Sequence, residues 1–219
     1  MVRRLALLPV LSCLLLACEI SDTEVRETRI DRVLIHDQDG KVWDVTQAVV
    51  RFGFDPSGFQ FGLGAHTMTP LVFPPSAVPG GPDYPGDAES FLVIGVSVAG
   101  VARAYRLDHI PDVEVVDDTL AATPVAVVHR PLTGEPSAHA RLLGDTPLTL
   151  SASGWLYENQ SVLFDYETES LWYRLEGESR LTCIAGTHFL KTLPAIAFAV
   201  QPWNVWRASH PVTTYMVRR

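Results

Sequence analysis

The chain has 219 residues, of which 47% are hydrophobic and 19% charged, and its formal net charge at pH 7 is −8. This length and hydrophobic content suffice for one sizeable core and argue against a disordered chain. A nucleic-acid-binding protein needs a basic face, but the only runs of Lys or Arg are the pairs at residues 3–4 and 218–219. We therefore predict that nucleic acid is not a partner.

The N-terminus is typical of an export signal. A basic pair at residues 3–4 precedes an apolar stretch over residues 5–16, which is shorter than the roughly 20 residues that a membrane span needs. The sequence Leu15-Leu16-Ala17-Cys18 resembles a bacterial lipobox, in which the cysteine is lipidated before the signal peptide is cleaved. We predict that residues 1–17 are this signal and that Cys18 is lipidated. The alternatives are an ordinary cleaved signal peptide and lipidation of Cys13.

This assignment predicts a location. Acyl chains on Cys18 would hold the protein permanently at the bacterial cell envelope, facing out of the cytoplasm, so the membrane is the expected partner. Glu19 in place of an aspartate favours the outer membrane if the cell has two membranes, and residues 18–29 are expected to form a polar tether. Only Cys183 then remains as a free thiol, so no internal disulfide can form.

The globular part is expected to begin with a β-hairpin over residues 34–36 and 41–45, because Asp37-Gln38-Asp39-Gly40 is typical of a turn. The same four residues partly match a calcium-binding loop, but the later ligands are missing, which favours the turn. A short helix is predicted over residues 46–52, with Thr46 as its N-cap and Gly53 as its end.

Residues 66–90 contain six prolines and three glycines, a composition that excludes a helix or a central strand. We predict a long surface loop here, with a lid as one option. Strands return at residues 91–98 and 101–107, a hairpin that turns at Ala99-Gly100. Further strands are predicted at residues 113–116, 125–129, 148–150, 155–164 and 171–175, and a short helix at residues 203–209.

Strands outnumber helices, which indicates a mainly β fold, barrel-like or sandwich-like, with a few short helices; α+β is the second choice. The predicted division is a small hairpin and helix subdomain at residues 30–65, the proline-rich loop at residues 66–90 and the main β-rich domain at residues 91–219.

The order of short motifs after residue 91 resembles a bacterial extracytoplasmic family known as domain of unknown function 3179, in which some members are selenoproteins. No single motif is specific, but many occur in the same order over about residues 91–215. They include residues 100–105 (GVARAY), 114–119 (EVVDDT), 123–127 (TPVAV), 154–157 (GWLY), 164–165 (FD), 168–172 (TESLW), 193–194 (LP), 206–207 (WR) and 210–211 (HP).

The departures from this family bear on function. Relatives typically have Y-C-P-L-C-G where this chain has His129-Arg130-Pro131-Leu132-Thr133-Gly134, and a His-Glu pair where it has Val113-Glu114. Two vicinal sulfurs can cycle a disulfide or share a soft metal, whereas Arg130 and Thr133 cannot. The resemblance therefore implies a redox-type or metal-binding site whose reactive residues are lost together.

We accordingly predict no catalytic residue, no metal ligand and no cofactor, and a non-catalytic binding or structural role with an unidentified protein or small-molecule partner. The candidate residual site comprises Asp118, His129, Arg130, Thr133 and Cys183. The alternative is an envelope oxidoreductase or metal-dependent enzyme that uses this relocated site. A third hypothesis places a tryptophan-lined ligand cavity beneath residues 66–90. The acids between residues 165 and 169 are predicted to be solvated in a hairpin connection.

Overall fold

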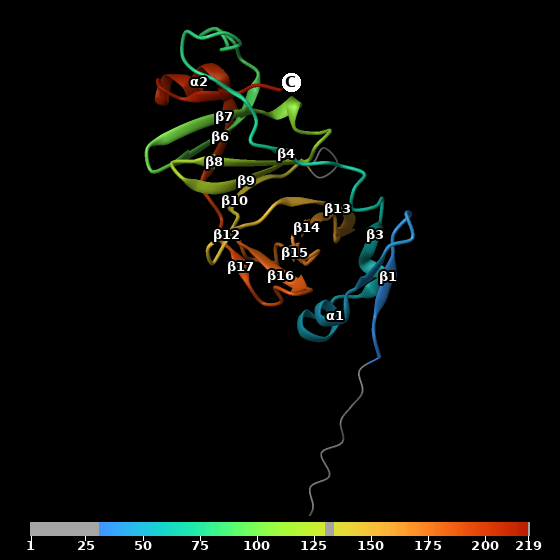
Figure 1. Ribbon diagram of the computed structural model, residues 1–219. Helices are drawn as coiled ribbons and strands as arrows, with labels where there is room; N and C mark the ends of the chain where they lie inside the picture. The colour runs from blue at the N-terminus through green and yellow to red at the C-terminus, as the bar shows by residue number, and fades with distance from the viewer. Residues whose placement is uncertain (1–30, 130–133, 219) are drawn as a thin grey trace, which may run out of the picture. The chain divides into compact units, whose positions relative to one another are not determined.

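The computed structural model describes residues 31–129 and 134–218, and residues 31–219 form one compact unit. Within this part the chain is mainly β, as predicted, with nineteen strands and two α-helices (Figure 1). No helix of the described residues is long and apolar enough to cross a membrane. Lipidation at Cys18 falls outside the described residues and stays a prediction.

The N-terminal segment forms the predicted hairpin and helix. Strands β1 (Leu34–His36) and β2 (Val42–Asp44) pair antiparallel, and Asp37 closes the turn between them by accepting hydrogen bonds from the backbone N–H groups of Asp39 and Lys41. Helix α1 (Thr46–Phe52) ends at Gly53, whose φ of 73° is left-handed.

The prediction that Thr46 is the N-cap of α1 is wrong. Thr46 is the first helical residue, and the carboxylate of Asp44 accepts hydrogen bonds from its N–H and its hydroxyl at 3.0 and 2.6 Å. The Thr46 hydroxyl in turn accepts from the N–H of Val33 at 2.8 Å. The N-cap position is occupied by Val45, whose side chain cannot cap, and Asp44 one residue earlier accepts from the first N–H of the helix.

Three larger sheets follow, and they carry the core. The six-stranded sheet has the order β17-β16-β15-β14-β13-β3, the four-stranded sheet β10-β9-β8-β4, and the five-stranded sheet β18-β6-β7-β19-β5. The six-stranded sheet contains β3 (Phe59–Phe61), β13 (Leu150–Tyr157), β14 (Gln160–Asp165), β15 (Leu171–Tyr173), β16 (Leu181–Ala185) and β17 (Thr192–Leu193).

The four-stranded sheet contains β4 (Leu71–Val72), β8 (Val115–Leu120), β9 (Thr123–His129) and β10 (Pro136–Ala140). The five-stranded sheet contains β5 (Ser76–Ala77), β6 (Leu92–Val98), β7 (Val101–Arg106), β18 (Phe198–Pro202) and β19 (Thr214–Met216). A small pair, β11 (Leu142–Leu143) and β12 (Thr146–Pro147), helix α2 (Trp203–Ser209) and two 3-10 turns (Pro56–Gly58 and Leu107–His109) complete the fold.

The sheets stack as a layered sandwich, with the four-stranded sheet in the middle (Figure 1). Alternate residues of its strands face opposite layers. Val116 and Leu120 of β8 pack in one core with Ile94 and Tyr105 of the five-stranded sheet. Val115 of the same strand packs in another core with side chains of the six-stranded sheet. The fold therefore buries both faces of β8, including its two acidic residues, Asp117 and Asp118.

Short helices cover the outer faces of the stack. Helix α1 and the β1–β2 hairpin pack on the six-stranded sheet in a core with Trp43 and Phe164. Helix α2 places Trp203 and Trp206 on the five-stranded sheet. Gly95 of β6 allows Trp206 to pack closely on this sheet, because a Cβ atom at residue 95 would lie 2.3 Å from the Trp206 ring.

Two predictions about strands need correction. The single strand expected at residues 155–164 is the hairpin of β13 and β14, with Glu158 and Asn159 in the turn at φ of 47° and 62°. The proline-rich residues 66–90 do contain strands, β4 and β5, but only at sheet edges, where a missing proline N–H is tolerated.

Candidate functional site

The structure does not gather the predicted residual site into one cluster. Arg130 and Thr133 lie outside the described residues. Asp118 of β8 faces the five-stranded sheet, where it contacts Tyr105, whereas Cys183 of β16 belongs to the core between the four-stranded and six-stranded sheets. The two side chains therefore lie on opposite sides of the middle sheet.

Asp118 is bonded into the fold on both of its carboxylate oxygens. Its Oδ2 accepts a hydrogen bond from the Tyr105 hydroxyl at 2.8 Å and pairs with the Arg103 guanidinium, and its Oδ1 accepts from the N–H of Thr119 at 2.7 Å. Burial and the Asp118 charge raise the pKa of Tyr105 well above its usual value. This cluster fixes β7 against β8 and engages both carboxylate oxygens of Asp118 in bonds within the fold.

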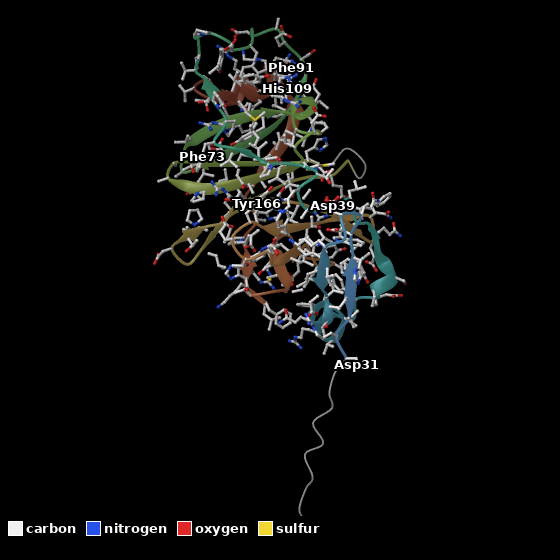
Figure 2. The ribbon with its side chains drawn as sticks, turned by 45° about the vertical axis from the view of Figure 1, so that its right-hand side comes forward. Asp31, Asp39, Phe73, Phe91, His109 and Tyr166 are labelled. Carbon is white, nitrogen blue, oxygen red and sulfur yellow. The ribbon has the colours of Figure 1, made fainter. Side chains whose placement is uncertain are left out.

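His129 ends β9 immediately before the family's reactive-loop position. Its backbone N–H donates to the Glu114 carbonyl oxygen at 2.9 Å. Its ring Nδ1 has no hydrogen-bond partner among the described residues. Burial lowers the pKa of His129, which favours the neutral imidazole. The ring lines a depression of about 520 Å³ with Phe91, Leu92, Leu107, Asp108 and Pro111. Phe91 and His109 lie at this end of the β6–β7 hairpin (Figure 2).

Cys183 is placed as a core residue. Its side chain is fully buried, and its Sγ donates to the Ala185 carbonyl oxygen at 3.3 Å. Burial raises the pKa of the thiol to about 12, so the reactive thiolate is scarce at neutral pH. A buried thiol of this kind is chemically inert in the folded protein.

We expect Cys183 to react with a thiol reagent only when the protein unfolds. The chain treated with 5,5′-dithiobis(2-nitrobenzoate) in native buffer should release little chromophore, and the same sample in guanidinium chloride should react quickly, because only unfolding exposes the sulfur. Fast labelling of the native protein would contradict the placement of this thiol in the core.

A buried ion pair that the sequence analysis did not single out lies beside Asp118. Asp117 points from β8 to the opposite face, where its Oδ2 accepts from the Leu150 N–H at 2.8 Å and its Oδ1 lies 3.7 Å from Nε of Arg141. Arg141 donates to the carbonyl oxygens of Val125, Leu148 and Asp118 at 3.2, 2.7 and 3.1 Å. Both side chains are almost completely buried.

The Asp117–Arg141 pair is poorly compensated electrostatically. Arg141 directs its hydrogen bonds at carbonyl groups, and Oδ1 of Asp117 has no hydrogen-bond donor. Desolvation consequently raises the pKa of Asp117 to about 7 despite the nearby guanidinium. No sequence signal marks Arg141, which follows the small strand β10 as a single basic residue.

Two other expectations about the site are wrong. Asp165 is not a solvated acid: it is fully buried, and it accepts hydrogen bonds from Nε1 of Trp172 at 2.8 Å and from the Thr168 N–H at 2.7 Å. Beneath residues 66–90, Trp203 fills the core instead of lining a cavity. It is fully buried and contacts the rings of Tyr84, Phe91 and Tyr215.

The described residues contain no group of three or more His, Cys, Asp or Glu side chains placed to hold a metal ion. The fold is a layered β sandwich, in which Asp117, Asp118 and Arg141 are bonded within the packed sheets. The chain belongs to the family "Protein of unknown function (DUF3179)", whose family model matches residues 84–219. No curated protein and no solved structure matches the chain.

Proposed function

We propose that this protein is a lipid-anchored lipoprotein of the bacterial cell envelope, whose β domain binds or organises other molecules without catalysis. One observation carries the non-catalytic part: two described side chains of the candidate residual site, Asp118 and Cys183, are bonded into the fold. Asp118 is held by Tyr105 and Arg103, and Cys183 is sealed in an apolar core.

The remaining group, His129, is a neutral imidazole in a mostly apolar depression. Asp108 also lines this depression, but the ring Nδ1 of His129 bonds no carboxylate among the described residues. A neutral histidine can accept or donate one hydrogen bond to a ligand, whereas activation of a nucleophile needs a second, paired group. This arrangement favours binding over turnover. A stoichiometric transition metal in the protein purified from membranes, measured by plasma mass spectrometry, would instead favour the envelope oxidoreductase.

The anchor is tested by replacing Cys18 with alanine. We expect this variant to move from the membrane fraction to the soluble fraction, because loss of the acyl chains removes about 0.8 kcal/mol of membrane affinity for every buried methylene. The measurement is an immunoblot of fractionated cells after a high-salt wash.

The matched control is Cys13→Ala. Cys13 lies before the predicted cleavage point, so its removal should leave the protein in the membrane fraction. If the Cys18 variant stays membrane-bound while the Cys13 variant is released, the acceptor is Cys13; if both stay bound, the lipid-anchor proposal fails.

A further inference from the structure

A polar cleft lies on the six-stranded sheet beside the edge of the four-stranded sheet. It consists of an open part of about 650 Å³ and a narrow recess of about 50 Å³, which share Glu135, Gln160 and Arg174. The volume of the open part falls within the roughly 300–1,000 Å³ of typical ligand sites.

The strand order explains why this cleft exists. Strand β10 is the last strand of the four-stranded sheet, and the cleft lies beside it, between its residues Pro136 to His139 and the six-stranded sheet. Cross-strand neighbours Gln60, Leu156 and Ser161 form the floor there, on β3, β13 and β14, and Arg174 follows β15. Gln60 and Ser161 are accessible to solvent on either side of the buried Leu156, and this row across adjacent strands suits an extended ligand.

The side chains of the cleft are already arranged as a hydrogen-bonding array. Nη2 of Arg174 donates to Oε2 of Glu135 at 2.6 Å, and its Nε donates to Oε1 of Gln160 at 3.3 Å. Glu158 and Asn159 lie at the tip of the β13–β14 hairpin and add a carboxylate and an amide. Planar carboxylate, amide and guanidinium groups can each bond two neighbouring hydroxyls.

The recess ends at a buried histidine with an unused ring nitrogen. His139 of β10 is only 1% exposed, its Nε2 lies 3.0 Å from Oγ of Ser137, and its Nδ1 has no hydrogen-bond partner. Burial and the Arg174 charge lower the pKa of His139 to about 4, so the ring is neutral. Buried polar atoms are rarely left unpaired, which marks this recess as a place where a ligand or water hydroxyl completes the bonding.

An exposed aromatic ring lies at the mouth of the cleft. Phe61 of β3 is 55% exposed, and its φ of 73° is unusual for a residue with a bulky side chain. Its carbonyl oxygen accepts from Nε2 of Gln38 at 3.0 Å, which helps to hold this backbone. Strained residues of this kind concentrate at ligand sites, and an exposed ring offers a flat apolar platform.

Two other ligand classes fit less well. The lining has two carboxylates, Glu135 and Glu158, against one guanidinium, a net charge of −1 that disfavours an anionic ligand. A peptide cannot extend the sheet at β10, because the segment after β17 already bonds its edge: the Ala140 N–H donates to Pro194 and the Ile196 N–H donates to Ala138, both at 2.8 Å.

We propose that this cleft binds a neutral oligosaccharide, with one sugar face stacked on Phe61 and the hydroxyls bonded by Gln160, Arg174 and the neighbouring acids. The ligand class follows from the combination of a flat apolar ring, a band of planar polar side chains and a slightly negative charge. This site is separate from the depression at His129 and does not depend on the lipid anchor.

The test uses the full chain in a detergent without a sugar headgroup. A glycan array first compares neutral with acidic oligosaccharides, and calorimetric titration with cellotriose, maltotriose and tri-N-acetylchitotriose follows. We expect binding to at least one neutral trisaccharide, and we expect Phe61→Ala to weaken it about tenfold through loss of the stacking contact. Gln160→Ala should weaken the same interaction through loss of the hydrogen bonds.

Phe198→Ala is the matched control, because Phe198 is also an exposed phenylalanine, 40% accessible, but lies on β18 of the five-stranded sheet. It should leave the affinity unchanged, and thermal melts of all variants identify any that fail to fold. The proposal is overturned if no neutral glycan binds at the highest soluble concentration, if acidic glycans bind better than neutral ones, or if folded Phe61 and Gln160 variants bind as tightly as the original chain.

Discussion

Arg141→Met is expected to lower the free energy of unfolding by about 3–5 kcal/mol near pH 8, the usual cost of removing one partner from a buried ion pair. Arg141 donates hydrogen bonds to three carbonyl oxygens, those of Val125, Leu148 and Asp118, and its charge lies 3.7 Å from Asp117. Methionine fills a similar volume but supplies no donor. Urea unfolding followed by tryptophan fluorescence measures the change.

Arg180→Met is the surface control for this prediction. Arg180 also pairs with a carboxylate, Glu178 at 2.8 Å, but its side chain is 54% exposed, so its loss should leave the free energy of unfolding almost unchanged. The double variant Arg141→Met with Asp117→Asn tests the mechanism. If the uncompensated Asp117 charge causes much of the loss, the double variant should be more stable than Arg141→Met alone. Equal stability of Arg141→Met and the original chain would refute the structural role of the pair.

The strands and helices that the sequence predicts well are those with strong local signals. The β6–β7 hairpin has a Val/Ile-rich run and a turn that contains Gly100, and α1 ends at Gly53. The β13–β14 turn was missed because Glu158 adopts a left-handed backbone that few non-glycine residues take. Tertiary contacts, not local preference, impose that conformation.

Strand β16 was missed for a different reason. All five of its residues, Leu181–Ala185, are buried, so the sequence shows no alternation of polar and apolar positions. Strand β18 ends at Pro202, and proline argues against a strand in any reading of local sequence. It is nevertheless formed, because it lies at the edge of the five-stranded sheet and pairs only with β6.

The site was less predictable than the fold, because its residues come together only through the stacking of sheets. Asp117 and Asp118 are adjacent in sequence but face different layers, so they have different partners: Arg141 on one side, and Tyr105 with Arg103 on the other. Arg141, His139 and Arg174 are single residues without a motif. Their importance depends on burial and on the cleft beside β10, which no local pattern records.

The original chain is expected to lose free energy of unfolding as the pH rises, and Asp117→Asn is expected to remove this loss. The pKa of Asp117 is about 7 in the folded protein and 3.8 when unperturbed, so the folded state holds a proton that the unfolded state releases between these values. This favourable contribution is complete below about pH 4 and is lost as the pH rises through 7, a change of up to about 4 kcal/mol. Asparagine does not titrate, so its variant should lack this decline.

The measurement is the free energy of unfolding of both proteins from about pH 4 to pH 8, compared as the difference between them at each pH. As the pH rises, the free energy of unfolding of Asp117→Asn should increase relative to that of the original chain. A pH-independent cost of the amide would offset all the points equally and would not change this trend. Asp108→Asn, measured from about pH 2 to pH 5, is the control with the opposite sign. The Arg106 guanidinium lowers the pKa of exposed Asp108 below 3.8, so this variant should lose stability relative to the original chain as the pH rises through that range, by less than about 1 kcal/mol. A pH-independent difference for Asp117→Asn would mean that Asp117 stays ionised in the core throughout this range and that Arg141 compensates its charge more fully than a separation of 3.7 Å allows.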